Sequence, residues 1–332
     1  MDQIAWPGFL DLVASPLGAA GLSAALGSPV VLVDLSGPAA SAGAEPVAAA
    51  VAGLPVVVVG VGRDGLDGLP AEVTGLLDLV VADPGPVVAV VEAAPQAAVT
   101  LAMTLRASPA LGVPAGLAAE SAAYSMLQAG PEFARWRAAT PQPAPSPEPE
   151  PGPPVVAERA GACLQITLNR PGRHNAVNAA LRDRLVEALL VACADPTIER
   201  VVLAGAGPSF CSGGDLAEFG TRPDPATAHL VRLTRSPARL LAELGPRLEV
   251  RLHGACIGAG IEMAAFAGRV VAHPEAVISL PEVGLGLIPG AGGTVSLPRR
   301  IGRHRTAELA LTGRPIDAAT AHRWGLVDAI EP

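Results

Sequence analysis

Two glycine-rich turns in the second half of the chain have the residue types needed to bind a negatively charged oxygen. The first reads FCSGGDL (residues 210–216) and the second reads HGACIGAGIE (residues 253–262). Each is expected to lead directly into a helix, so that backbone N–H groups point outward at the helix's positive end. Two such donors converging on one point make an oxyanion hole, which stabilises charge developing on a carbonyl oxygen. Small residues are needed because the ligand must touch the backbone.

Two acids lie near these turns. Glu262 is expected in the first turn of its helix, and Glu282 follows a strand and Pro281, just before the loop 284–293. Two facing carboxyls can hold a water between them, one activating the water and the other delivering a proton to a conjugated double bond. Sequence alone does not show that they face each other. Glu262 could instead be a helix N-terminal acid favoured by the dipole, and Glu282 a solvated loop acid.

Alternating strands and helices are expected to position these residues, which indicates an α/β fold. Asn178 is expected to cap a helix that runs to about Ala194. The expected strands of this half cover residues 163–168, 200–204, 248–252, 269–272 and the start of 276–302, and a further helix covers 318–324.

A proline-rich segment over residues 140–154 separates an N-terminal part, 1–139, from a C-terminal part, 155–332. Alternating proline favours an extended, semi-rigid spacer. The N-terminal part shows a weaker version of the same alternation of expected strands and helices. It has expected strands at 29–35, 55–59 and 80–84 and a helix at 45–53, and we interpret it as a degraded copy of the same unit.

Five ordered segments resemble the crotonase (enoyl-CoA hydratase/isomerase) superfamily, over about residues 162–331. FCSGGDL resembles its F-x-x-G-A-D-L signature, and HGACIGAGIE resembles its G-x-x-x-G-G-G-x-E segment. The remaining matches are LPEVGLGLIPGAGGTVSLPRRIG (280–302), NRPGRHNAVN (169–178) and TGRPIDAATAHRWGLVDAI (312–330). The resemblance implies a crotonase-like spiral of repeated ββα units, preceded by a smaller, degenerate α/β unit.

The resemblance also implies roles for individual residues. Gly214 and Ala259 would donate the two oxyanion N–H groups, and Glu262 and Glu282 would be the catalytic acid–base pair. Ala259 stands where the family has a glycine and Gly214 where it has an alanine; we expect a backbone donor to tolerate either exchange. Binding of the acyl-CoA is expected to involve Ser212, Gly213, Asp215, Gly258, Pro281 and Gly290. Asp215 could equally be a structural cap.

The chain departs from the family in ending soon after the G-L-V segment, where relatives continue into helices that cover the CoA site and build a trimer. Residues 97–139 resemble those missing helices, including a pattern from Glu120 to Phe133. We therefore expect helices of the N-terminal part to pack on the C-terminal core.

Composition excludes several other functions. The net charge of −8 and the lack of a basic stripe argue against nucleic acid as a partner. Four cysteines without paired spacing are expected to be reduced core thiols of a cytoplasmic protein, and no metal motif appears. Residues 86–105 are expected to form a buried strand and a buried helix rather than a membrane span. Gly60–Gly65 matches G-x-G-x-x-G, but Gly68 and Pro70 disfavour the helix that must begin there in a dinucleotide-binding site.

The sequence thus predicts an enoyl-CoA hydratase that adds water reversibly to a 2,3-enoyl-CoA thioester. It would need no metal or redox cofactor, because CoA enters with the substrate, and family resemblance implies a homo-oligomer, a trimer or hexamer. Two alternatives stay open. One is another crotonase reaction, namely isomerisation, decarboxylation or thioester hydrolysis, and the other is a non-catalytic subunit that binds acyl-CoA.

Overall fold

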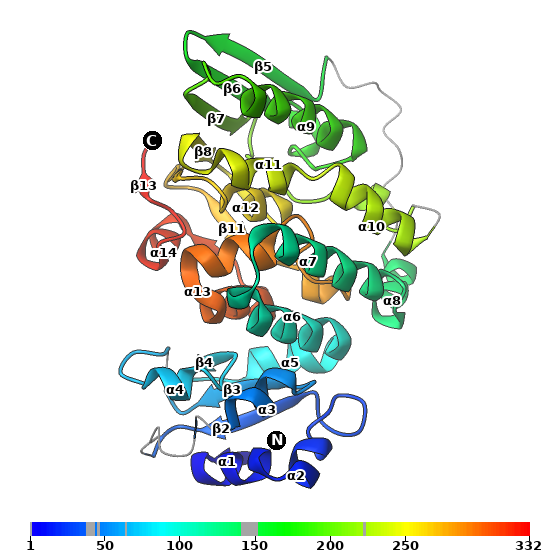
Figure 1. The fold of residues 1–332 in the computed structure, drawn as a ribbon, viewed down its shortest axis with the longest axis vertical. Helices are drawn as coiled ribbons and strands as arrows, with labels where there is room; N and C mark the ends of the chain where they lie inside the picture. The colour runs from blue at the N-terminus through cyan, green and yellow to red at the C-terminus, as the bar shows by residue number, and fades with distance from the viewer. Residues whose placement is uncertain (1, 38–43, 45–46, 64, 141–151, 222–223) are drawn as a thin grey trace.

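The structure, a computed structural model, describes the chain except for residues 1, 38–43, 45–46, 64, 141–151 and 222–223. Most of the proline-rich segment predicted over 140–154 therefore lies outside the described residues. Figure 1 shows an N-terminal sheet at one end of the molecule and a larger α/β core toward the other, with helices α5 to α8 between them.

The N-terminal sheet has four parallel strands in the order β1-β2-β3-β4. Its central strands are the valine-rich runs expected from the sequence, and almost every residue in them is buried, as in parallel sheets covered on both faces. After β3 the next described helix begins at Ala71, so no helix starts at the G-x-G-x-x-G match. The elements are β1 (Gln3–Ala5), α1 (Trp6–Ala14), α2 (Pro16–Gly21), β2 (Val30–Asp34), α3 (Ala48–Gly53), β3 (Val57–Val61), α4 (Ala71–Thr74) and β4 (Leu79–Val81).

Four helices and a 3₁₀ turn follow the sheet: α5 (Gly85–Ala93), α6 (Pro95–Ala107), η2 (Ser108–Ala110), α7 (Val113–Gln128) and α8 (Pro131–Ala139). The strand expected near residue 86 is wrong, because that segment is helix α5. Its buried residues Val87 and Val91 are four apart, the spacing of one helix face. In the described residues no single helix is long and apolar enough to cross a membrane. By length and composition alone, the pair 85–93 and 95–110, bent by 110°, passes that test.

The C-terminal core contains a six-stranded sheet in the order β13-β10-β8-β7-β6-β5 and a three-stranded sheet in the order β12-β11-β9. Its strands are β5 (Val155–Ala160), β6 (Cys163–Leu168), β7 (Arg200–Gly205), β8 (Leu248–Leu252), β9 (Ala255–Ile257), β10 (Arg269–Ala272), β11 (Val277–Ser279), β12 (Ile316–Asp317) and β13 (Ala329–Ile330). Its helices are α9 (Ala179–Ala194), α10 (Pro225–Thr234), α11 (Pro237–Leu244), α12 (Ala259–Ala264), α13 (Gly293–Thr312) and α14 (Ala318–Trp324). Asn178 caps α9 as predicted, since its side chain accepts from Leu181 N at 2.9 Å.

The first glycine-rich turn does not enter an α-helix. Residues 216–218 form a single 3₁₀ turn, η4, capped by Asp215, whose side chain accepts from Ala217 N at 3.2 Å. Of the two turns predicted from the sequence, only the second is followed by an α-helix, α12. A helix dipole can therefore act at Ala259 but not at Gly214.

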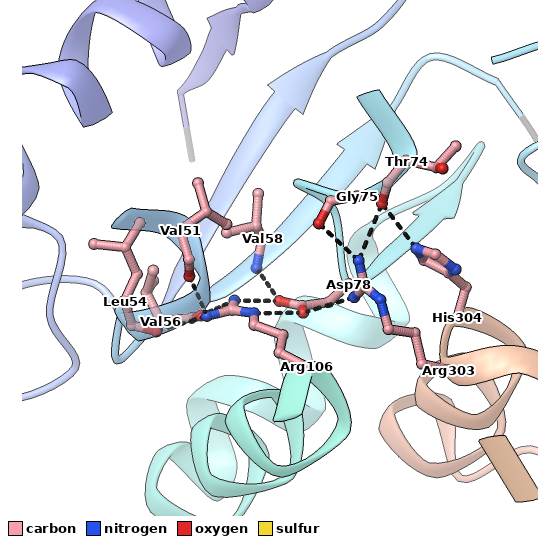
Figure 2. Close-up of polar contacts among 10 residues, drawn as sticks. All are labelled: Val51, Leu54, Val56, Val58, Thr74, Gly75, Asp78, Arg106, Arg303 and His304. Atoms are coloured by element: carbon pink, nitrogen blue, oxygen red, sulfur yellow. Dashed lines mark hydrogen bonds and ion pairs between the residues drawn. The ribbon is translucent and has the colours of Figure 1, made fainter. Parts of the chain in front are cut away.

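A buried polar network joins the N-terminal sheet to the helices beside it (Figure 2). Asp78, which immediately precedes β4, pairs with Arg106 of α6 at 2.6 Å and accepts from Val58 N at 2.8 Å. From α13, Arg303 and His304 contact the carbonyl oxygen of Thr74 at 3.1 and 2.9 Å. The network fixes the sheet against α6 and against the C-terminal core at once.

Residues 97–139 pack on the core, as expected. Ser108 Oγ donates to Thr294 O at 2.8 Å, Ser125 Oγ to Pro225 O at 2.9 Å, and Arg137 Nη1 to Gly220 O at 2.9 Å. The described contacts therefore run along most of this helical segment. The interpretation of the N-terminal sheet as a degraded copy of the core's own unit stays a prediction.

Candidate active site

The two glycine-rich turns lie side by side. Cys211 N donates to Ala255 O at 3.1 Å and Ile257 N donates to Cys211 O at 2.9 Å, an isolated parallel bridge. The contact is tight, because a Cβ added at Gly213 would lie 3.1 Å from Ile257 O. Glycine at 213, with φ +96°, therefore permits both the backbone conformation and the approach of the second turn.

The backbone N–H groups of Gly214 and Ala259 donate to no acceptor among the residues that the structure describes. Their neighbours are paired, since Asp215 N donates to Val177 O at 3.0 Å and Gly258 N to Ser279 O at 3.0 Å. Within the described part of the chain no acceptor contacts the N–H of Gly214 or of Ala259, the first residue of α12. Both residues line one cavity. Two free donors at a cavity wall are what an oxyanion hole requires.

Gly214 is tightly packed. A Cβ at this position would lie 2.5 Å from the ring of Phe219, which fills the space beside the turn. An alanine at 214 in this chain would therefore require Phe219 to move, because interiors leave little room for an added methyl group. Ala259, in contrast, lies at the cavity wall with its methyl group accommodated.

Glu262 is 2% exposed, in the first turn of α12 as predicted. Its Oε2 accepts from Ala291 N at 2.7 Å and from Gly293 N at 2.9 Å, while Oε1 contacts no donor of the described residues. Burial, followed by the charges of Glu282 and Glu120, raises the pKa of Glu262 well above its usual value. The site therefore favours the protonated form of this carboxyl.

Glu282 begins a 3₁₀ turn, η6 (Glu282–Leu285), directly after Pro281. Its Oε2 is buried and has no hydrogen-bond partner among the residues described. Burial, with a smaller contribution from the charge of Glu120, raises the pKa of Glu282 to about 7. A buried polar oxygen without a partner is costly, so this atom is suited to a proton, a water or a substrate atom.

The cavity has a volume of about 540 Å³, and both halves of the chain line it. Six of the ten predicted site residues line it: Gly214, Asp215, Ala259, Glu262, Glu282 and Gly290. The other four, Ser212, Gly213, Gly258 and Pro281, are not among the described residues at its wall. Ser212 N donates to His174 O at 2.9 Å, which holds the first turn in place.

Asp215 has a structural role besides its place at the cavity wall. It pairs with Arg170 at 3.1 Å, and the two side chains are 16% and 7% exposed. It also caps the 3₁₀ turn that follows it. The position of Asp215 is therefore compatible with both roles considered from the sequence, acyl-CoA binding and structural capping.

The sequence indicated that residues 97–139 cover the site, but it assigned no role to the individual residues of these helices that complete the cavity. Helix α7 contributes Glu120 and Tyr124, and the ring of Tyr124 lies where a Cβ at Gly290 would come within 2.4 Å. From α10, Arg232 stacks on the Tyr124 ring at 4.7 Å and donates to Ser121 Oγ at 3.1 Å. The available signal was the pattern from Glu120 to Phe133, which resembles the C-terminal helices of the family.

No group of three or more His, Cys, Asp or Glu side chains in the described part of the chain is arranged to hold a metal ion. The cysteines are free thiols, and Cys211 and Cys256 are buried. Burial raises the pKa of the Cys211 thiol to about 12, so it is not a nucleophile at neutral pH.

A model of the family described as enoyl-CoA hydratase/isomerase matches residues 158–332. The chain belongs to this family. It is 38% identical over 178 residues to the 2,3-dehydroadipyl-CoA hydratase of Escherichia coli (strain K12), which covers 54% of this chain and 69% of that protein. It is also 38% identical over 168 residues to the 1,2-epoxyphenylacetyl-CoA isomerase of the same organism, over 49% of this chain and 64% of that protein.

The fold agrees with this family membership. A crystal structure of an enoyl-CoA hydratase from Bacillus anthracis superposes with a TM-score of 0.50 at 32% identity, over 54% of this chain and 70% of that one. The crotonase fold predicted from the sequence is confirmed. The chain spans about two-thirds of the length of the enoyl-CoA hydratase/isomerase relatives that it matches.

Proposed function

We propose that the protein adds water reversibly to the 2,3 double bond of an enoyl-CoA thioester. One observation carries the proposal: two unused backbone N–H groups and two buried carboxyls with raised pKa values line the same cavity. Acid–base groups tuned toward neutral pH are what a hydration at neutral pH requires. Hydratases among the relatives support the assignment.

The N–H groups of Gly214 and Ala259 would bind the thioester oxygen. As the water oxygen bonds to C3, the electrons of the C2–C3 double bond shift through the conjugated carbonyl group onto the thioester oxygen. The intermediate is an enolate with its negative charge on that oxygen. Donors that are already aligned stabilise this charge without reorganisation. Ala259 would add the positive end of α12, while Gly214 has only a 3₁₀ turn behind it.

Glu262 and Glu282 would share one proton in the active form. The ionised carboxyl takes a proton from water as the oxygen bonds to C3, and the protonated carboxyl gives its proton to C2. The pair then holds the same number of protons as before, so no external acid or base is consumed. Since backbone donors stabilise the enolate and the pair moves the protons, we propose that no metal or redox cofactor is needed. Ser212, Gly213, Asp215, Gly258, Pro281 and Gly290 are proposed to shape the acyl-CoA site.

The test is loss of the conjugated enoyl-thioester absorbance with short, medium and aromatic enoyl-CoAs. We expect turnover by the wild type and a decrease of roughly 10²–10⁴-fold in Glu282→Gln and in Glu262→Gln. Glu275→Gln is a matched control, because the Glu275 side chain is 88% exposed and outside the cavity. Equal activity in the two site variants and the control would refute the acid–base pair.

Other outcomes select among the alternatives. Conversion of an acyl-CoA without hydration, detected by product analysis, would favour isomerisation, decarboxylation or thioester hydrolysis at the same oxyanion site; one relative is named as an isomerase. Binding of enoyl-CoA without turnover of any substrate would favour a non-catalytic acyl-CoA-binding subunit. We further propose a cytoplasmic homo-oligomer, a trimer or hexamer, and light scattering on the purified chain tests the oligomeric state.

A further inference from the structure

Four consecutive residues at the start of α13, the last two of the preceding loop and the first two of the helix, donate their N–H groups alternately to two glutamates from different halves of the chain. Ala291 N and Gly293 N donate to Glu262 Oε2 at 2.7 and 2.9 Å. Gly292 N and Thr294 N donate to the Oε1 and Oε2 atoms of Glu120 at 2.7 and 2.8 Å. The segment 291–294 is thus held between the two carboxyls.

The backbone conformation makes this alternation possible. Gly292 has φ +103°, and a Cβ there would lie 2.5 Å from the Phe266 ring, so both the turn and the packing require glycine. Gly293 is equally constrained, since its Cβ would lie 2.6 Å from Glu262 Cγ. A segment fixed so closely to Glu262 transmits any displacement to that carboxyl.

Glu120 is bound as an acceptor only. Besides the two N–H groups it accepts from Thr294 Oγ1 at 2.7 Å, and its residue is 2% exposed. All three contacts stabilise the ionised form, and so does the positive end of α13, which begins at Gly293. Removing this carboxylate would leave two buried N–H groups without an acceptor.

We propose that Glu120 is a positioning residue of the acid–base pair, acting through segment 291–294 on Glu262, and that the N-terminal part is thereby a required component of the active site. This inference rests on the hydration proposed above. It assigns a function to the helices placed ahead of the core in this chain, since Glu120 lies on α7 and is separated from its partner Thr294 by 174 residues in sequence.

Glu120 also acts through its charge. Its negative charge raises the pKa of Glu262 and of Glu282, and burial raises its own pKa to about 7. The other groups that face it are Arg232, whose charge lowers the pKa of Glu120, and Tyr124; His229 of α10 contacts the neighbouring Ser121. Removing the charge must lower the pKa of both catalytic carboxyls, so activity should move to lower pH.

The experiment compares kcat/KM against pH for the full-length wild type, Glu120→Gln and Glu132→Gln. Glu132 is the matched control, because it is buried in the same group of helices, accepts two backbone N–H groups, from Gln96 and Ala97, and does not line the cavity. We expect both limbs of the profile to move down by about one pH unit in Glu120→Gln and to stay in place in Glu132→Gln. An unmoved profile in Glu120→Gln would overturn the proposal.

A second measurement separates this inference from the hydration itself. Glutamate labelled with ¹³C at the carboxyl carbon, with the Glu262 signal assigned by its absence in Glu262→Gln, reports the titration of Glu262 whether or not enoyl-CoA is turned over. A lower Glu262 midpoint in Glu120→Gln supports the proposal, and an unchanged midpoint refutes it. Thr294→Val removes one donor to Glu120 but keeps the chain's charge. It should shift the Glu262 midpoint in the same direction by less, so it provides the test should Glu120→Gln fail to fold.

Discussion

Gly258 and Glu282 lie so close that no side chain fits between them: a Cβ at Gly258 would be 2.3 Å from Glu282 Oε1. Gly258 also has φ +50°, a conformation that residues with side chains rarely adopt. Gly258 is not among the described residues that line the cavity, whereas Glu282 is. The absence of a side chain at Gly258 leaves the space that the Glu282 carboxyl occupies. The predicted role of Gly258 in binding the acyl-CoA becomes, in geometric terms, a role in placing Glu282.

Gly258→Ala should reduce turnover by about 10²-fold while leaving the protein folded, because a displacement of about 1 Å at a catalytic group costs that much. Gly284→Ala is the control, since Gly284 is exposed, has no positive φ, and its added methyl group would meet nothing within 4 Å. Steady-state kinetics with circular dichroism on both variants check the prediction. Equal activity of the two variants would contradict the placement of Glu282.

The activity should have a bell-shaped pH dependence with its acid limb near pH 7. The pKa of Glu282 is about 7 and that of Glu262 is raised well above its usual value, so the first proton leaves the pair near neutrality rather than near pH 4.5. Activity falls below that limb because no ionised carboxyl is left to accept a proton from water. It falls at higher pH because no proton is left for C2; both limbs belong to the pair rather than to one residue. An acid limb near pH 4.5 in kcat/KM would contradict this.

Glu282→Gln should make the protein more stable at pH 8 than the wild type. The folded-state pKa of Glu282, about 7, lies above its usual value of 4.5. The wild type therefore keeps the full contribution of this group below pH 4.5 and loses it as the pH rises to about 7. The amide does not ionise, so we expect an advantage on the order of 3 kcal/mol at pH 8. Urea unfolding at pH 5 and pH 8 measures it, with Glu275→Gln as control; an equal difference at the two pH values would count against the burial of the charge.

Local sequence patterns were sufficient for the parts of the site that lie within one turn. The two glycine-rich turns and Glu262 at a helix start depend on neighbours a few residues away, and the structure has them where they were expected. Glu120 could not be assigned in this way. Its role depends on contacts with Gly292 and Thr294, 172 and 174 residues away, and no periodicity reports such a pairing.

The helix α5 was mistaken for a strand for a related reason. Its segment is rich in valine, which favours strands because a β-branched side chain packs well on a pleated surface. Tertiary packing decides otherwise, since α5 lies against α6 and α13. The 3₁₀ turn after Gly214 was missed because the turn's glycines fit either continuation.

The buried pair of Asp78 and Arg106 should contribute more to stability than any exposed pair. Their side chains are 2% and 5% exposed, and Arg106 also donates to the carbonyl oxygens of Val51, Leu54 and Val56 at 2.7–2.9 Å. Asp78→Ala would leave a buried guanidinium without its carboxylate and Val58 N without its acceptor. We expect a loss of about 3–5 kcal/mol in the free energy of unfolding.

Arg159→Ala provides the comparison, because the Arg159–Asp195 pair has side chains 43% and 34% exposed and should contribute less than about 1 kcal/mol. Urea denaturation gives both values, and hydrogen exchange locates the loss. Faster exchange in Asp78→Ala should concentrate in β3, β4 and α6, which the pair joins. Since α6 also packs on α7, the same variant should loosen the helix that carries Glu120, and turnover should fall although Asp78 lies outside the cavity. Full activity in a destabilised Asp78→Ala would show that the active-site helices are held by the core alone.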